Sequence, residues 1–213
     1  MAYDLEEQEQ LENLRAFWKK YGNFILTVVI VVALAAAGWG FWNRYQNSQA
    51  QEAAAAYQQL MQAAQAKDVA KVRESAGVLF DRHGGSAYGG MAALVAARAY
   101  IDAGDAKAAK VPLRWAIDNA HGDEFRHVAR LRLATVLLDE KAFDEGLKVL
   151  DVQVAGPYAA EYADRRGDLL LEAGRADEAR SAYQQALDKL APNSPLRRLI
   201  QLKLYALGTG AAA

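Results

Sequence analysis

The fold is decided by one stretch of the chain, Gly167-Asp-Leu-Leu-Leu-Glu-Ala-Gly174-Arg-Ala-Asp-Glu-Ala-Arg-Ser-Ala-Tyr183-Gln-Gln-Ala186. It consists of two runs of residues that favour helices, and Gly174 separates them. A glycine in that place is typical of a helix end, which predicts two helices joined by a tight turn. Small residues would let the helix backbones approach each other, and larger ones would fill the space between them. The residues concerned are Gly167, Leu170, Ala179, Tyr183 and Ala186.

The same pattern occurs twice more upstream. Residues 93–105 and 130–142 align with residues 163–175. The second helical stretches of the three units are residues 106–119, 143–152 and 176–190. Equivalent turn residues at Gly104, Lys141 and Gly174 are 37 and 33 residues apart, close to the period of about 34 residues in tetratricopeptide repeats. The chain is therefore predicted to be all-α, with a tetratricopeptide-like array of helical hairpins.

The first two units place small and large residues at the same positions as the third. Their inward residues are expected to be Ala97, Tyr100, Ala109, Leu113 and Ala116 in one unit, and Ala134, Leu137, Gly146 and Leu150 in the next. Residues 51–80 read as a degenerate earlier unit that turns at Lys67-Asp68. Its inward residues would be Tyr57, Leu60 and Leu79.

The C-terminal end is predicted to form a capping helix that covers the last repeat. Asn193 or Ser194 can cap the start of this helix, Pro195 suits its first turn, and Gly208 would end it. Without such a helix the last repeat would expose its apolar side to water. The covering face is expected to consist of Leu196, Leu199, Ile200, Lys203, Leu204 and Leu207.

The N-terminal part contains an uncharged stretch of 23 residues, 21–43, between Lys20 and Arg44. As a helix it would be about 35 Å long, enough to cross a hydrocarbon core of about 30 Å. Aromatic residues at both ends would lie at the level of the lipid headgroups. The alternative is a cleavable signal peptide ending at Ala35-Ala36-Ala37, but the mostly polar lead of residues 1–20 favours an uncleaved anchor.

The distribution of basic residues predicts the orientation of this span. Arg15, Lys19 and Lys20 precede it, whereas Arg44 alone follows before Lys67. Since positive charges near a span favour the cytoplasmic side, the N-terminus is expected inside a bacterial inner membrane and the repeat domain in the periplasm. The predicted parts are a cytoplasmic segment 1–20, a membrane helix 21–43, a periplasmic repeat domain 44–208 and a flexible tail 209–213.

The residue types argue against catalysis, cofactors and nucleic acid. The chain has no cysteine and three histidines, His83, His121 and His127, which lack the spacing of a metal site. Ser86 lies in a glycine-rich stretch, but Tyr88 stands where a nucleophile elbow needs glycine. From Arg44 onward the chain has 22 basic and 21 acidic residues, so it lacks the excess of positive charge that nucleic-acid binding needs. Neither an enzyme nor a small-molecule substrate is predicted, and binding of proteins or peptides remains.

Several stretches in this order resemble a known family. They are Glu9-Gln-Leu-Glu-Asn-Leu-Arg-Ala-Phe-Trp-Lys-Lys-Tyr-Gly-Asn23 before the span, Gly38-Trp-Gly-Phe-Trp-Asn-Arg-Tyr45 at its end, Tyr88-Gly-Gly-Met-Ala-Ala-Leu94, Leu131-Arg-Leu-Ala134, Arg165-Arg-Gly-Asp168, and Gly174-Arg-Ala-Asp-Glu-Ala-Arg-Ser-Ala-Tyr183. Together they are similar to the YfgM-like family, the ancillary subunit of the bacterial SecYEG translocon. The resemblance covers nearly the whole chain.

The resemblance implies an inner-membrane protein whose partners are the SecYEG channel and a membrane-anchored periplasmic folding factor of the PpiD type. It also implies a role in passing newly exported polypeptides to periplasmic chaperones. The same architecture would suit an adaptor in another envelope complex, such as outer-membrane assembly or division. An enzyme that uses Ser86 with a neighbouring histidine is a third hypothesis.

Two surfaces are candidates for partner binding. The first helices of the repeats would form a concave face that grades from apolar to acidic and would suit an amphipathic helix or a positively charged segment. Its residues are Met91, Leu94, Arg98, Ile101, Val128, Leu131, Thr135, Leu138, Glu161, Asp164, Asp168 and Leu171. Many of the apolar ones would equally serve as core between helices. In the span, small residues would let another membrane helix approach closely, and these are Ala33, Ala37 and Gly40.

Overall fold

The long first helix, α1 (Ala2–Gln65), carries the apolar stretch near the N-terminus. The computed structural model describes residues 2–153 and 156–209 and divides the chain into two compact units, Met1–Gln51 and Glu52–Ala213. The side chains from Leu26 to Trp42 are exposed in the first unit, so no protein surface covers them. Among the described residues, one helix is long and apolar enough to cross a membrane, and it contains this stretch.

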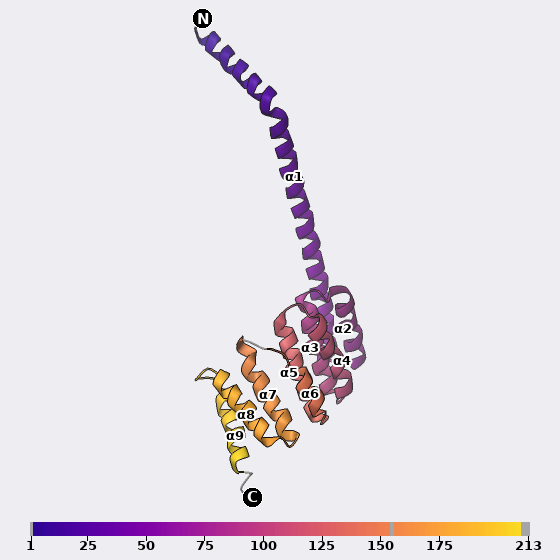
Figure 1. Cartoon of the computed structure of the whole chain (residues 1–213). Coiled ribbons are helices and arrows are strands. Elements are labelled where there is room, and N and C mark those ends of the chain that lie inside the picture. Colours follow the sequence, from indigo (N-terminus) through magenta and orange to yellow (C-terminus); the bar gives the residue numbers. More distant parts are fainter. Residues whose placement is uncertain (1, 154–155, 210–213) are drawn as a thin grey trace. The chain divides into compact units, whose positions relative to one another are not determined.

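The second unit is built from helical hairpins, as predicted (Figure 1). After the end of α1 come α2 (Val69–His83), α3 (Ala87–Asp102), α4 (Ala106–Asn119), α5 (Asp123–Asp139), α6 (Phe143–Val149), the 3-10 turn η1 (Gly156–Tyr158), α7 (Ala159–Glu172), α8 (Ala176–Lys189) and α9 (Leu196–Thr209). In the part of the chain that the structure describes every regular element is helical. The all-α prediction is thereby confirmed.

Each hairpin turns through one residue with a left-handed backbone. The φ angles are 55° at Lys67, 79° at Gly104, 59° at Lys141 and 78° at Gly174. At Gly104 the N–H bonds the carbonyl of Ile101, and the next N–H, from Asp105, bonds the carbonyl of Tyr100. The other three turns repeat this pair of bonds, which satisfies carbonyls at the end of the first helix. The hairpin at residues 51–80 therefore turns in the same way as the others.

The core consists of consecutive apolar clusters along the array. Leu60, Val72 and Leu79 belong to the first cluster and are fully buried. The next clusters contain Leu113 and Leu133, then Leu150 and Leu169, and finally a cluster in α7, α8 and α9. Because each cluster joins only neighbouring elements, the array has the local packing of a repeat protein.

Glycines are used where helices approach closely. A Cβ atom at Gly167 of α7 would lie 2.5 Å from the Tyr183 ring of α8, and one at Gly146 of α6 would lie 2.7 Å from Leu169 of α7. Both distances are below contact, so any side chain there would push the helices apart. The contact agrees with the expectation that Gly167 lets the helix backbones approach and that Tyr183 fills the space between them.

The structure corrects two details of the predicted elements. The second helix of the middle unit ends at Val149 and not at residue 152, since β-branched Val149 and Val152 are poor helix formers and η1 follows closely. In the capping helix, Ile200 is fully buried and Leu196, Leu204 and Leu207 pack on the last cluster. Leu199, however, is 49% exposed, because it lies about 100° around the helix from Ile200.

The ends of α9 also differ from the prediction. Ser194 accepts the N–H of Arg197 through its main-chain oxygen. Gly208 lies inside the helix, which continues to Thr209. Except for Thr209, the predicted tail 209–213 lies outside the described residues.

A substitution in the α7–α8 contact tests this packing. Replacing Gly167 with Ala should lower the free energy of unfolding by about 1–3 kcal/mol, because the new methyl group would overlap the Tyr183 ring. Gly77, inside α2, is the matched control, since a Cβ there meets nothing within 4 Å. Gly77→Ala should raise stability by about 0.5–1 kcal/mol through helix propensity. Chemical denaturation followed by circular dichroism measures both, and equal effects would contradict the proposed contact.

Candidate protein-interaction groove

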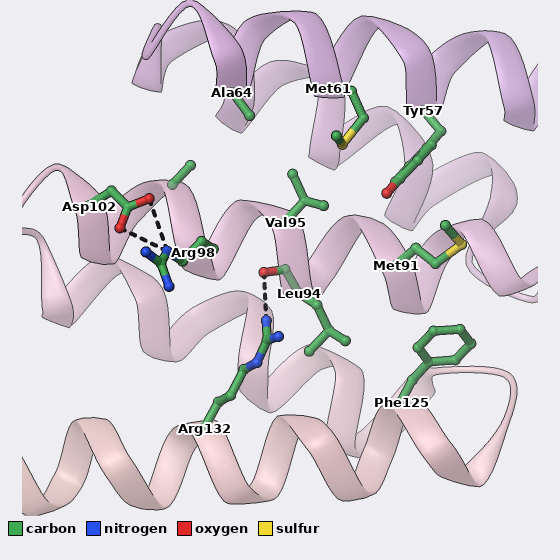
Figure 2. Close-up of a pocket in the computed structure, with 11 residues that line it drawn as sticks. Tyr57, Met61, Ala64, Met91, Leu94, Val95, Arg98, Asp102, Phe125 and Arg132 are labelled. Carbon is green, nitrogen blue, oxygen red and sulfur yellow. Dashed lines mark hydrogen bonds and ion pairs between the residues drawn. The ribbon is translucent and has the colours of Figure 1, made fainter.

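Residues of α3 that were predicted to form the concave face line an open pocket with α1 and α5. The pocket has a volume of about 430 Å³. Figure 2 shows side chains from the three helices pointing into the same space. Tyr57, Met61 and Ala64 come from α1, Met91, Leu94, Val95, Arg98, Ala99 and Asp102 come from α3, and Phe125 and Arg132 come from α5. Met91, Leu94 and Arg98 thus lie together, as expected from their spacing.

The lining of this pocket is largely apolar and adaptable. Met61 and Met91 carry flexible thioether side chains that can fit differently shaped partners. Tyr57 packs against Tyr88 with ring centroids 5.6 Å apart, which fixes one side of the pocket. Burial raises the pKa of the Tyr57 hydroxyl above its ordinary value, and Tyr88 adds to this shift. The phenol is therefore neutral and available for hydrogen bonding.

Two arginines lie at the edge of the pocket and differ in their partners. Arg98 donates to Asp102, one turn further along α3, with its Nε 2.8 Å and 3.0 Å from the two carboxylate oxygens. Arg132 donates to the main-chain oxygen of Leu94 at 3.2 Å. Burial lowers the pKa of the Arg132 guanidinium, and the Arg98 cation lowers it further. Both groups remain cationic at neutral pH because arginine starts from a very high pKa.

A second pocket, of about 290 Å³, shares both arginines. It is lined further by Ile101 and Ala106 and by three residues of α5, Thr135, Val136 and Asp139. The two pockets together form one surface feature, which we call the α3–α5 groove. Of the predicted concave residues, the groove collects Met91, Leu94, Arg98, Ile101 and Thr135.

Other apolar residues predicted for the concave face take part in the core. Leu131 and Leu138 pack on the cluster that contains Ala134, Leu150 and Leu169. Leu171 packs on the cluster of α7, α8 and α9. Val128 is half-buried on α5. These leucines therefore pack as core between helices, which is the alternative role that the sequence allowed for them.

The predicted acidic end of the face is covered by α9. Nζ of Lys203 lies 2.7 Å from both Asp164 and Asp168. The Tyr183 hydroxyl donates to Asp168 at 2.8 Å, and Arg165 lies 3.2 Å from the same carboxylate. Glu161, one turn before Asp164, is half-buried. The chain itself thus supplies partners for two of the three acidic residues.

Burial dominates the electrostatics of this cluster. It raises the pKa of the Asp164 carboxyl, although the hydrogen bond from Lys203 acts in the opposite direction. Burial also raises the pKa of the Tyr183 hydroxyl, and the negative charge of Asp168 adds to the shift. Tyr183 is therefore a neutral donor that fixes the position of Asp168.

The serine and the histidines that were considered as catalytic or metal-binding residues form contacts within the fold. The Ser86 hydroxyl donates to the main-chain oxygen of His83 at 2.7 Å, and His83 is buried. His127 lies 3.0 Å from the Tyr162 hydroxyl through its Nδ1 and stacks on Tyr158. Where the structure describes side chains, no group of three or more acidic or histidine residues could hold a metal ion.

In α1 the small residues of the span are exposed. Ala33, Ala37 and Gly40 have no neighbouring helix within the first unit, and a Cβ atom at Gly40 would meet nothing within 4 Å. Gly38, on the opposite side of the helix, is equally open. Larger side chains can therefore replace either glycine without disturbing the described fold.

Comparison with known proteins supports the resemblance seen in the sequence. A family model described as a tetratricopeptide repeat-like domain matches residues 15–209. The ancillary SecYEG translocon subunit of Neisseria gonorrhoeae is 32% identical over 208 residues, which cover 97% of this chain and 100% of that protein. The chain belongs to the family of ancillary SecYEG translocon subunits, the YfgM-like family. Two further members are similar over most of their length. The Escherichia coli protein is 29% identical over 93% of this chain and the Haemophilus influenzae protein 26% over 87%.

Membership of this family decides the question of catalysis. The family is a non-enzymatic tetratricopeptide scaffold, so the chain is not an enzyme. The contacts of Ser86 and His83 described above are in accord with structural roles for these residues. The α3–α5 groove is accordingly considered as a surface for binding polypeptides.

Sequence reasoning missed part of the groove. Phe125 and Arg132 of α5 and Met61 of α1 line it but were not among the expected residues. Arg132 lies one turn before Val136 and one position after Leu131, and repeat alignment alone places it beside the face and not on it. The signal that could have found Met61 is its spacing of four from Tyr57, which puts both on one side of the helix.

Removal of the Lys203 ammonium should destabilise the second unit in a pH-dependent way. In Lys203→Met the two aspartates lose their shared partner, and we expect the free energy of unfolding at pH 8 to fall by about 2 kcal/mol, less than for a fully buried pair. The pKa of Asp164 is already raised, so its ionised form disfavours folding. The free-energy cost of ionising Asp164 in the folded state is absent at pH values below the ordinary pKa of an aspartate. It grows as the pH rises from that value to the raised pKa of the folded state.

The deficit of Lys203→Met should therefore shrink as the pH falls below about 4, the ordinary pKa of an aspartate, because Asp164 then becomes protonated in the unfolded state as well as in the folded one. Denaturant titrations at several pH values measure it. Lys107→Met, at an exposed position of α4, serves as the control and should change little. A deficit that is independent of pH would contradict the role assigned to the ion pairs.

Proposed function

We propose that this protein is a membrane-anchored scaffold associated with the SecYEG translocon, which binds other polypeptides through the α3–α5 groove. The observation that carries this proposal is the full-length similarity to the ancillary SecYEG translocon subunit of Neisseria gonorrhoeae. An open apolar groove on a helical repeat array and a long uncovered apolar helix support it. The proposed role is to help pass newly exported polypeptides to periplasmic chaperones, with a PpiD-type folding factor as a second partner.

The membrane arrangement forms part of the proposal. Residues 21–43 would cross the inner membrane, with residues 1–20 in the cytoplasm and residues 44–208 in the periplasm. The basic residues Arg15, Lys19 and Lys20 before the span support this orientation. The exposed apolar side chains of the first unit would then face lipid, where exposure carries no hydrophobic cost.

A fused reporter tests the orientation. Alkaline phosphatase joined after Ala213 needs disulfides to fold, so it should be active in cells only if the C-terminus reaches the periplasm. We expect activity from the full chain and none from a variant that lacks residues 21–43. An inactive fusion, together with an active cytosolic reporter at the same place, would overturn the proposed arrangement.

Association with the translocon can be tested by co-purification. The full chain, extracted from its host in a mild detergent, should recover SecYEG subunits and a PpiD-type protein, identified by mass spectrometry. Recovery of outer-membrane assembly or division proteins instead would favour the alternative function as an adaptor in another envelope complex. Failure to recover translocon subunits would reject the proposed association.

Variants of the span show whether its small residues provide the contact. Ala37→Leu combined with Gly40→Leu should reduce translocon recovery several-fold, because both substitutions block close approach of a partner helix. Ala35→Leu combined with Gly38→Leu places the same bulk on the opposite side of the helix and should leave recovery unchanged. Equal recovery with both pairs would exclude this face as the contact while leaving the association itself intact.

A further inference from the structure

We infer that the α3–α5 groove selects a polypeptide segment that places a carboxylate on Arg132 and apolar side chains in the adjoining pocket. The inference rests on the proposed function, because it specifies the chemistry of the segment that the groove would bind. From the sequence, the concave face was expected to suit an amphipathic helix or a positively charged segment, and the inference replaces the positive charge with a negative one.

The first argument is that Arg132 lacks an anionic partner. A guanidinium has five N–H donors in a planar fork that matches a carboxylate. For Arg132 the structure gives one acceptor, the neutral main-chain oxygen of Leu94 at 3.2 Å. Among the residues whose side chains the structure describes, no carboxylate forms an ion pair with it. Asp102 in the same pocket is paired with Arg98, and Asp139 lines the second pocket but not the apolar one, so Arg132 leaves a cation beside the apolar pocket that can attract an anion from a partner.

The second argument is that the surroundings strengthen such a contact. Burial and the nearby Arg98 cation both disfavour the charge on Arg132, as the lowered pKa indicates. An incoming carboxylate would relieve the repulsion between the two arginines, and because Arg132 is exposed, water and salt would screen part of this attraction. Arg98 cannot serve equally well because its guanidinium already donates to Asp102.

The third argument is that two of the three acidic residues expected on the concave face already have partners within the chain. Lys203 lies 2.7 Å from both Asp164 and Asp168 and also 5.3 Å from the centre of the Tyr183 ring. A basic partner segment would have to displace this lysine together with the α9 residues packed around it. Asp164 and Asp168 are therefore unavailable to a basic partner, whereas Arg132, beside the predicted face, has no anionic partner.

The apolar part of the groove determines which residues of the bound segment lie next to its carboxylate. The pocket beside Arg132 is lined by Met61, Met91, Leu94 and Phe125, which offer an apolar surface of adaptable shape (Figure 2). The preferred segment thus carries apolar residues next to an acidic residue or a C-terminal carboxylate. Both sources present the same group to Arg132, and the experiment separates them.

Binding of designed peptides to the full chain in mild detergent tests the inference. The probes are short apolar host peptides of Leu, Met and Ala that carry Glu, Gln or Lys at one position in turn, each with a free or an amidated C-terminus. Fluorescence anisotropy measures their affinities. Wild type should bind the Glu peptide several-fold more tightly than the Gln peptide, since an ion pair with an exposed guanidinium is screened by water and salt. A preference for free over amidated C-termini would identify the chain end as the source.

Variants of Arg132 make the test specific. Arg132→Gln should lose the preference for the carboxylate while still binding the Gln peptide, which shows that the groove remains folded. Arg132→Lys should retain part of the preference, because it keeps the charge but not the fork. Arg198→Gln, at an exposed position of α9, is the control and should behave as wild type.

Several results would overturn the inference. These are equal affinity of wild type for Glu and Gln peptides, tighter binding of the Lys peptide, or a preference that survives in Arg132→Gln. Absence of binding by any host peptide would overturn it as well. Co-purification distinguishes this failure from failure of the proposed function, because recovery of translocon subunits without peptide binding would leave the scaffold role standing and remove the groove from it.

Discussion

The array depends on a backbone constraint that recurs at each hairpin turn. Lys67, Gly104, Lys141 and Gly174 all adopt positive φ, and each turn closes with the same two backbone hydrogen bonds. A left-handed residue followed directly by the next helix reverses the chain within three residues. At Asp68 and Asp105, the residue after the turn also caps the next helix through its side chain. The turns therefore place the helices of a hairpin side by side through local backbone contacts alone.

Small residues then allow the helices that the turns place side by side to pack closely. Gly167 lets α7 approach the Tyr183 ring of α8, and Gly146 makes room for Leu169 between hairpins. The same Tyr183 donates to Asp168, so one side chain joins helix packing to the ion pairs with α9. This connection explains why the last hairpin needs α9, since Ile200 covers its apolar side while Lys203 neutralises its carboxylates.

What could be predicted from the sequence is what local periodicity determines. The turns at Gly104, Lys141 and Gly174 and the small residues between paired helices follow from spacing within about forty residues. The contacts of Lys203 with Asp164 and Asp168 join residues 39 and 35 positions apart and depend on how α9 crosses the last hairpin. Periodicity does not determine how α9 is rotated about its own axis against the last hairpin. For this reason Leu199 was expected to be buried, whereas it is 49% exposed. The joining of Met61, Met91 and Phe125 in one pocket likewise depends on the stacking of separate hairpins.

The charge that a partner meets on the concave face likewise depends on tertiary contacts and not only on the local sequence pattern. Counting residues on the predicted concave face gives an acidic end at Glu161, Asp164 and Asp168 and suggests a basic partner. A charge influences a partner, however, only to the extent that the chain leaves it uncompensated. Lys203 compensates Asp164 and Asp168, and Asp102 compensates Arg98, whereas Arg132 has only a neutral carbonyl as acceptor. The electrostatic character of the face therefore depends on which residues remain unpaired after folding, and beside the apolar pocket the unpaired charge is that of Arg132.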